Sequence, residues 1–174
     1  MKRFLIVVDM QNDFVDGALG SAEAVAIVPR VCDKIKNFDG QIIVTYDTHT
    51  EDYMNTLEGK NLPVPHCIEN TFGWQLNKDV MQALEGKEYI EIEKPTFGSV
   101  DLPEVIREIA GFEDFEIELL GLCTDICVVS NALLLKANFP ESYISVDGKC
   151  SAGVTVESHN AALTTMKMCQ IDIK

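Results

Sequence analysis

Apolar runs with strand character alternate with helix-like segments along this 174-residue chain, and this alternation constrains its fold more than any other feature. The runs are Arg3–Val8, Gln41–Tyr46, Tyr89–Glu93, Phe115–Leu122 and Ser142–Val146, with a short sixth at Gln170–Ile173. Repeated strand–helix–strand units with apolar strands form parallel sheets covered on both faces. The pattern therefore predicts a three-layer α/β/α, Rossmann-like fold with a six-stranded, mostly parallel sheet, in one domain spanning residues 1–174.

Helical spacing of apolar residues fills the intervals between these runs. The predicted helices are Ile27–Phe38 with Pro29 in its first turn, Gly73–Leu84, a helix with Asp101 as its N-cap, Asp125–Asn138, and Val156–Met168. The stretch from Asp47 to Thr71 has neither period. Irregular segments of that length in compact domains usually carry function.

The composition excludes several classes of protein. A formal net charge of −14 disfavours binding to nucleic acid, and no segment is apolar for long enough to span a bilayer. The start of the chain carries no signal-peptide cleavage pattern, so we expect a cytoplasmic protein that is not attached to a membrane. Its six cysteines are scattered without paired spacing, which favours free thiols over a disulfide framework.

Three reactive side chains follow predicted strands. Asp9 ends the first strand, Lys94 ends the third, and Cys127 comes a short turn after the fourth. The carboxyl ends of parallel strands converge on one crevice, so an acid, an amine and a thiol should meet there. Cys127 at a helix start beside Lys94 is expected to be a stabilised thiolate nucleophile, with Asp9 moving protons.

A second group lies where the second strand ends. Asp47 and His49 are two residues apart in an extended segment and face the same way, and His66 returns from the far end of the irregular stretch. A carboxylate and two imidazoles suit zinc, iron or manganese. A structural zinc site that includes Cys67 is a rival interpretation, and His159 in the last helix is expected to be structural.

Five segments in this order resemble the isochorismatase-like cysteine hydrolases, and within them the nicotinamidases. They are VDMQNDF (Val8–Phe14), YDTH (Tyr46–His49), PHC (Pro65–Cys67), KPTFGSVDL (Lys94–Leu102) and GLCTDICV (Gly121–Val128). The resemblance implies a triad of Asp9, Lys94 and Cys127, with Cys127 as nucleophile. It also implies a cis peptide before Cys123 and oxyanion donors at the amides of Cys123 and Cys127.

The same resemblance implies further site residues and partners. The metal ligands would be Asp47, His49 and His66, holding a divalent ion, zinc in the first place. Phe14, Phe97 and Leu122 are expected to contact a small amide substrate. Members of the family commonly form homodimers or homotetramers.

Two positions depart from the nicotinamidase pattern. Asn55 stands where many members carry a further histidine, and Pro63 stands where several carry a tryptophan that stacks on the substrate ring. Tyr53 and Trp74 are other aromatic candidates. The leading hypothesis is hydrolysis of nicotinamide to nicotinate and ammonia through a thioester. The alternatives are a cysteine hydrolase of another small amide or carbamoyl compound, and a non-catalytic metal- or ligand-binding member.

Overall fold

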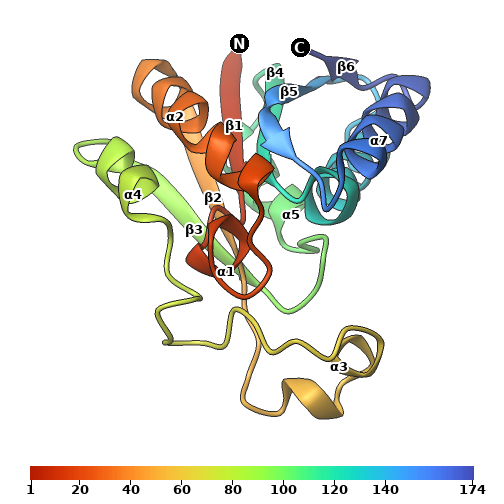
Figure 1. The fold of residues 1–174 in the computed structure, drawn as a ribbon. Helices are drawn as coiled ribbons and strands as arrows, with labels where there is room; N and C mark the ends of the chain where they lie inside the picture. The colour runs from red at the N-terminus through yellow and green to blue at the C-terminus, as the bar shows by residue number, and fades with distance from the viewer.

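Six parallel strands form one sheet in the computed structural model, which describes residues 1–174 (Figure 1). The strands are β1 (Lys2–Val8), β2 (Gln41–Asp47), β3 (Tyr89–Lys94), β4 (Phe115–Leu122), β5 (Tyr143–Ala152) and β6 (Asp172–Ile173), in the spatial order β3-β2-β1-β4-β5-β6. All five pairings are parallel. The predicted fold class is confirmed, and the predicted short sixth strand exists as a two-residue segment.

Helices cover both faces of the sheet. The helical segments are α1 (Asn12–Val15), α2 (Ala22–Asn37), a 3₁₀ turn at Tyr53–Asn55, α3 (Leu57–Asn61), α4 (Lys78–Leu84), α5 (Leu102–Ala110), a π-helical turn at Thr124–Val128, α6 (Val129–Asn138) and α7 (Val156–Met168). Residues of α2 and α4 share a buried core with one face, and residues of α5, α6 and α7 share a second core with the other. No helix is long and apolar enough to cross a membrane.

Two predicted helix starts were wrong. Helix α2 begins five residues early because the Ser21 hydroxyl accepts a hydrogen bond from Ala24 N, so Pro29 lies inside the helix and not in its first turn. Pro29 is tolerated because it is exposed, as is Val25, whose carbonyl loses its helical partner. Helix α4 begins late, after the N-cap Asn77.

The late start of α4 has a cause in the chain before it. The carbonyls of Gly73 and Gln75 accept hydrogen bonds from the backbone amides of Asp13 and Asn12. Because these two carbonyls are already hydrogen-bonded to a neighbouring segment, they cannot accept the amide hydrogen bonds of a first helical turn. At the start of α5, Asp101 occupies the predicted N-cap position, but its side chain makes no capping hydrogen bond.

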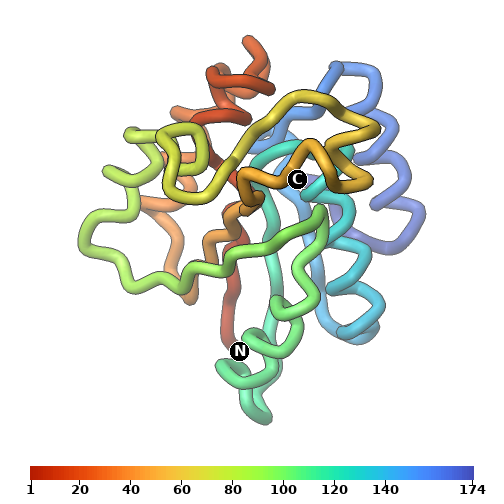
Figure 2. Tube along the Cα trace, turned by 90° about the horizontal axis from the view of Figure 1, so that it is seen from below, coloured from red at the N-terminus to blue at the C-terminus, as the bar shows by residue number.

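The segment between β2 and α4 lies across the carboxyl ends of the strands. In Figure 2, which views the molecule onto that edge, this yellow-to-orange segment crosses the ends of the central strands. It carries the 3₁₀ turn and α3, and an isolated bridge between His49 and Ile68 pairs its two arms. The irregular stretch thus covers the edge where the reactive residues were expected.

Candidate active site

Asp9, Lys94 and Cys127 meet at this edge, as the ends of β1, β3 and β4 predict. Lys94 Nζ lies 2.7 Å from Asp9 Oδ2 and 3.5 Å from Cys127 Sγ. Their exposed fractions are 0% for Asp9, 1% for Lys94 and 3% for Cys127. Sequence reasoning therefore predicted a real spatial cluster, in which the ammonium group bridges an acid and a thiol.

Backbone conformation and hydrogen bonds fix the positions of Asp9 and Lys94. Asp9 has φ of +49°, which ends β1 and turns the chain away from the sheet. Its carboxylate accepts a hydrogen bond of 2.6 Å from the Thr45 hydroxyl on the neighbouring strand. Lys94 ends β3 and donates to Thr96 O at 3.0 Å, so its position is defined on two sides.

Cys127 lies in the π-helical turn between β4 and α6. The Leu122–Cys123 peptide is cis, as the family resemblance implied, and Cys123 O accepts hydrogen bonds from the amides of Ile126 and Val128. Gly121, just before this turn, lies close against the backbone of β1. Any larger residue would clash there, because a Cβ would lie 2.1 Å from the carbonyl oxygen of Val8. The oxyanion role of the Cys123 and Cys127 amides stays a prediction.

Asn131 supports the turn from α6, and sequence reasoning missed it. Its side-chain amide donates to Cys127 O at 2.9 Å, and its Oδ1 accepts from Ser99 N at 2.8 Å. It is fully buried. A polar residue four positions after a suspected nucleophile, inside an otherwise apolar helix, was the signal that could have identified it.

The surroundings of Cys127 act against the thiolate that the sequence favours. Burial and the adjacent Asp9 carboxylate raise the pKa of its thiol well above the ordinary value, and the Lys94 charge only partly opposes them. Burial likewise raises the pKa of Asp9 despite Lys94. For Lys94, burial is outweighed by Asp9, Cys127 and Asp47, and its pKa is raised. The site therefore holds the ammonium in its charged form, whereas burial favours the neutral forms of the acid and the thiol.

The predicted metal ligands form a second cluster. Asp47 Oδ2 lies 3.0 Å from His49 Nε2 and 3.4 Å from His66 Nε2. Glu58 joins them from α3, with Oε1 at 3.6 Å from His49 Nε2 and 3.7 Å from His66 Nε2. One ligand atom from each of these four residues lies within 4.8 Å of the others.

These residues fit a divalent cation. Two carboxylates and two imidazoles, converging within 4.8 Å, form a donor set that zinc and other first-row divalent metals accept. Burial opposes ionisation of Asp47, but hydrogen bonds from His49 and His66 and the charge of Lys94 outweigh it and hold its pKa well below the usual range. His66 Nδ1 donates to Val64 O at 2.8 Å, which leaves Nε2 free to bind an ion.

Sequence reasoning missed Glu58, although the departure at Asn55 pointed to a change nearby. Asn55 is exposed and its amide bonds to Asp52, so it takes no part in the cluster. Thr56 caps α3 and sets Glu58 in its first turn, facing the histidines. Cys67, the rival ligand, is fully buried in the hydrophobic core and is not among the four clustered residues.

The aromatic candidates lie at different distances from this cluster. Phe14 contacts His66, with ring centroids 5.5 Å apart, and the buried Tyr53 lies 4.8 Å from the ring of His49. Phe97 is 42% exposed on the loop after β3, and Leu122 is fully buried before the cis peptide. Trp74 packs on Tyr46, with ring centroids 5.3 Å apart. Contact of Phe14, Phe97 and Leu122 with substrate stays a prediction.

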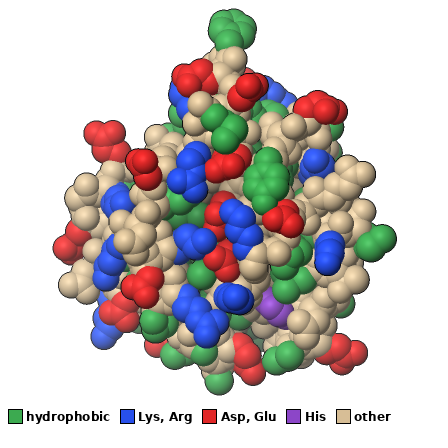
Figure 3. All heavy atoms as spheres, turned by 90° about the horizontal axis from the view of Figure 1, so that it is seen from above, with side chains coloured by type: hydrophobic (Ala, Val, Ile, Leu, Met, Phe, Trp, Pro, Cys, Tyr) green, Lys and Arg blue, Asp and Glu red, His purple; other side chains and the backbone are tan.

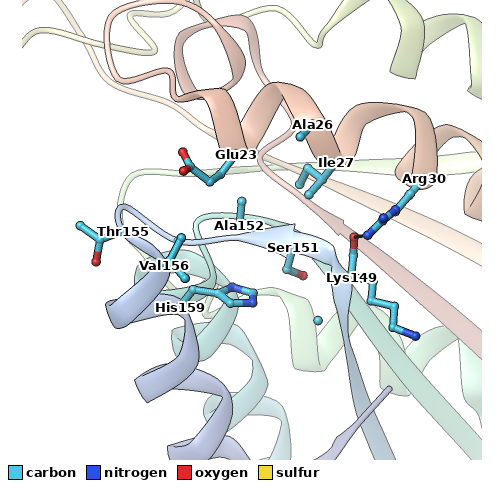
Figure 4. A pocket seen from close by; sticks show the side chains of 12 residues that line it. Glu23, Ala26, Ile27, Arg30, Lys149, Ser151, Ala152, Thr155, Val156 and His159 are labelled. Carbon is cyan, nitrogen blue, oxygen red and sulfur yellow. Dashed lines mark hydrogen bonds between the residues drawn. The ribbon is translucent and has the colours of Figure 1, made fainter.

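A separate cavity of about 320 Å³ lies between α2, β5 and the start of α7 (Figure 4). The ring of His159 points into the space beneath Ser151, and its Nδ1 lies 2.8 Å from the Thr124 hydroxyl. Asp125 accepts a hydrogen bond from Val154 N. His159 thus braces the turn that carries Cys127, in agreement with the structural role expected for it.

Comparison with known proteins decides the family. The isochorismatase domain family matches residues 3–173. The chain belongs to this family. Among its relatives, a nicotinamidase of Schizosaccharomyces pombe is 27% identical over 206 residues, covering 97% of this chain and 91% of that protein. A nicotinamidase/pyrazinamidase of Mycobacterium tuberculosis is 26% identical, covering 98% of this chain and 97% of the relative.

Solved structures of isochorismatase-like enzymes superpose over the whole chain. A Bacillus subtilis nicotinamidase matches with a TM-score of 0.84 and 27% identity, covering 99% of each chain. The pyrazinamidase of Pyrococcus horikoshii, solved in complex with zinc, matches with a TM-score of 0.84 and 27% identity, covering 100% of this chain and 99% of that one. The fold is therefore that of this family.

Proposed function

We propose that this isochorismatase-family protein is a metal-containing cysteine amidohydrolase that converts nicotinamide to nicotinate and ammonia. The observation that carries the proposal is the buried contact of Lys94 with both Asp9 and Cys127, beside a cluster of four metal-ligand side chains. The names of the nicotinamidase relatives support this substrate. Hydrolysis of a carbon–nitrogen bond other than a peptide bond is the class of reaction.

The first half-reaction forms a thioester. Cys127 Sγ attacks the amide carbonyl carbon while its proton passes to Asp9, so thiolate is formed only as the new bond forms. The raised pKa of Asp9 makes its carboxylate a better proton acceptor, and the raised pKa of Cys127 keeps the proton on sulfur until the new bond forms. The amides of Cys123 and Cys127 would donate to the oxyanion. To complete this half-reaction, Asp9 returns its proton to the leaving nitrogen, the carbon–nitrogen bond breaks, and ammonia departs to leave the thioester.

The second half-reaction releases the acid. Asp9 takes a proton from water, which attacks the thioester, and Cys127 leaves with that proton as a thiol. Lys94 stays charged throughout and holds the carboxylate and the sulfur in contact.

The cation is held by Asp47, His49, Glu58 and His66 in this proposal. Zinc is the leading candidate, supported by the zinc-bound Pyrococcus relative and by the imidazole-rich ligand set, with iron or manganese as alternatives. A divalent ion held by these residues would supply Lewis acidity beside the triad. Phe14 beside His66 would contact the ring, and assembly as a homodimer or homotetramer is part of the proposal.

Ammonia release from nicotinamide by the metal-loaded protein tests this function. Cys127→Ala should reduce turnover by about 10⁶-fold, the scale for losing a triad nucleophile, because the thioester cannot form. Asn131→Ala keeps the thiol but removes the hydrogen bond to Cys127 O, and we expect it to lose only part of the turnover. Equal turnover by Cys127→Ala would contradict the mechanism.

A related substrate is the second candidate, and the exposed Pro63 favours considering it. A proline there removes the aromatic partner that the nicotinamidase pattern places over the ring. The panel should therefore include pyrazinamide, an aliphatic amide and a carbamoyl compound. If kcat/KM for nicotinamide is lower than for the aliphatic amide, the reaction class stands and the substrate changes.

A further inference from the structure

Gln11 lies where the pairing between β1 and β2 stops. Val8 pairs with Thr45, and Asp9 N then donates to Thr45 O at 3.2 Å. The positive φ of Asp9 turns the chain out of the sheet, so no residue of β1 remains to pair with Asp47. Gln11 follows this turn and its side chain is fully buried.

The carboxamide of Gln11 takes the place of the missing strand residue. Its Oε1 accepts from Asp47 N at 2.8 Å, and its Nε2 donates to Asp47 O at 2.8 Å. The same Nε2 donates to Trp74 O at 2.8 Å, which ties in the segment before α4. An uncharged group with one acceptor and two donors satisfies all three backbone atoms, and in this length only glutamine offers it.

We propose that Gln11 is a positioning residue that sets the backbone of Asp47, and so its carboxylate, relative to Asp9. Asp47 Oδ2 faces both histidines, and Asp47 Oδ1 lies 3.6 Å from Lys94 Nζ. A displacement of this backbone therefore changes the cation site and the environment of Lys94 together. The inference rests on the proposed cation site, and its reach into the triad comes from this shared lysine.

Asn12 provides a matched control on the next residue. Its Nδ2 donates to Phe72 O at 2.8 Å, so it anchors the same segment before α4. It makes no hydrogen bond to Asp47 and is buried like Gln11. Loss of either side chain should destabilise the fold, but only Gln11 should act on the metal ligand.

The test measures metal binding, which does not require turnover. Gln11→Met keeps the side-chain volume and removes the three hydrogen bonds, and Gln11→Glu keeps an acceptor for Asp47 N but turns an oxygen toward two carbonyls. Zinc affinity is measured by competition with a chromophoric chelator, and the cobalt(II)-substituted proteins are compared by visible absorption. We expect Gln11→Met to bind zinc about 10–100-fold more weakly and to change the cobalt spectrum, as loss of a supporting partner does.

The control variant, Asn12→Ala, should differ from the Gln11 variants in zinc binding. Asn12→Ala should lower the melting temperature while leaving zinc affinity and the cobalt spectrum as in the native protein. Native affinity in Gln11→Met, or an equal loss in Asn12→Ala, overturns the inference. If Gln11→Met does not fold, Gln11→Glu with a native spectrum and affinity overturns it. No binding by the native protein overturns the cation site and this inference together, while ammonia release separately decides the role of Cys127.

Discussion

Two lysine–carboxylate contacts on this sheet behave in opposite ways. At the carboxyl edge, Lys94 lies 2.7 Å from Asp9, yet burial raises the pKa of Asp9. On the face of β4 beside α2, Lys34 and Lys174 lie 2.6 Å and 2.8 Å from Glu118. There the two hydrogen-bonded lysines outweigh burial, and the pKa of Glu118 is lowered.

The difference comes from what surrounds each pair. Asp9 shares one ammonium with the Cys127 thiol and with a second carboxylate, Asp47, and water is excluded. Glu118 has two ammonium groups that remain partly exposed, at 29% and 39%. Figure 3 shows acidic and basic side chains interspersed on the face seen from above, away from the active site. The Asp9 carboxylate is therefore more easily protonated than usual, and that of Glu118 less easily.

Asp9→Asn should have the largest effect on turnover relative to its effect on stability. Removing the group that accepts the thiol proton should lower kcat by roughly 10²–10⁴-fold. The free energy of unfolding should change much less than kcat, because the cost of burying the Asp9 charge offsets its attraction to Lys94. Ammonia release and urea unfolding of the same preparation measure both quantities. A large loss of stability with native turnover would reverse the interpretation.

Glu58→Gln tests the cluster beside the triad. A neutral amide keeps the shape of the side chain but removes one negative charge from the four ligand residues. Zinc affinity should fall by at least the roughly 10–100-fold associated with a lost supporting partner. Chelator competition measures it, with Glu51→Gln on the same exposed segment as the control. Unchanged affinity would exclude Glu58 as a ligand.

Glu118→Gln should have the reverse profile of Asp9→Asn. Losing a charge that two lysines contact should cost about 1–3 kcal/mol of the free energy of unfolding, with the lower part of that range favoured by the partly exposed lysines. Turnover should be unchanged, because Glu118 lies outside the catalytic edge. A drop in kcat/KM without a loss of stability would contradict the comparison.

The pH dependence of stability gives the smallest effect. The folded pKa values of Glu118 and Asp147 are lowered, with lysine hydrogen bonds outweighing burial. Their contribution is complete above the unfolded pKa values of about 4 and is lost as the pH falls through the folded ones. Glu118→Gln should therefore flatten the acid side of the stability curve, measured by urea unfolding at several pH values. An unchanged slope would show that Glu118 is not stabilised by its lysines.

The parallel six-stranded sheet and the meeting of Asp9, Lys94 and Cys127 could be predicted because both follow from local pattern and parallel topology. Each reactive residue stands at the end of an apolar run, and the carboxyl ends of parallel strands share one edge. Glu58 could not be predicted in this way. Its place depends on how α3 folds back over the histidines, and no periodicity encodes that path.

The direction of the pKa shift at Cys127 could not be predicted from the sequence either. A thiolate at Cys127 was a reasonable expectation from a helix start and a nearby lysine, but burial and Asp9 reverse the effect. Likewise Pro29 suggested a helix start, while the Ser21 cap began the helix earlier. In each case a tertiary or capping contact outweighed a correct local preference.

The most direct test of the account is a search for the covalent intermediate on Cys127. The metal-loaded protein is mixed with nicotinamide, quenched in acid within one turnover, and digested for mass spectrometry. The account predicts a nicotinoyl group on the peptide that contains Cys127, absent from Cys127→Ala and accumulating before nicotinate is released. Nicotinate formation in that first turnover, with Cys127 unmodified at every quench time, would contradict it.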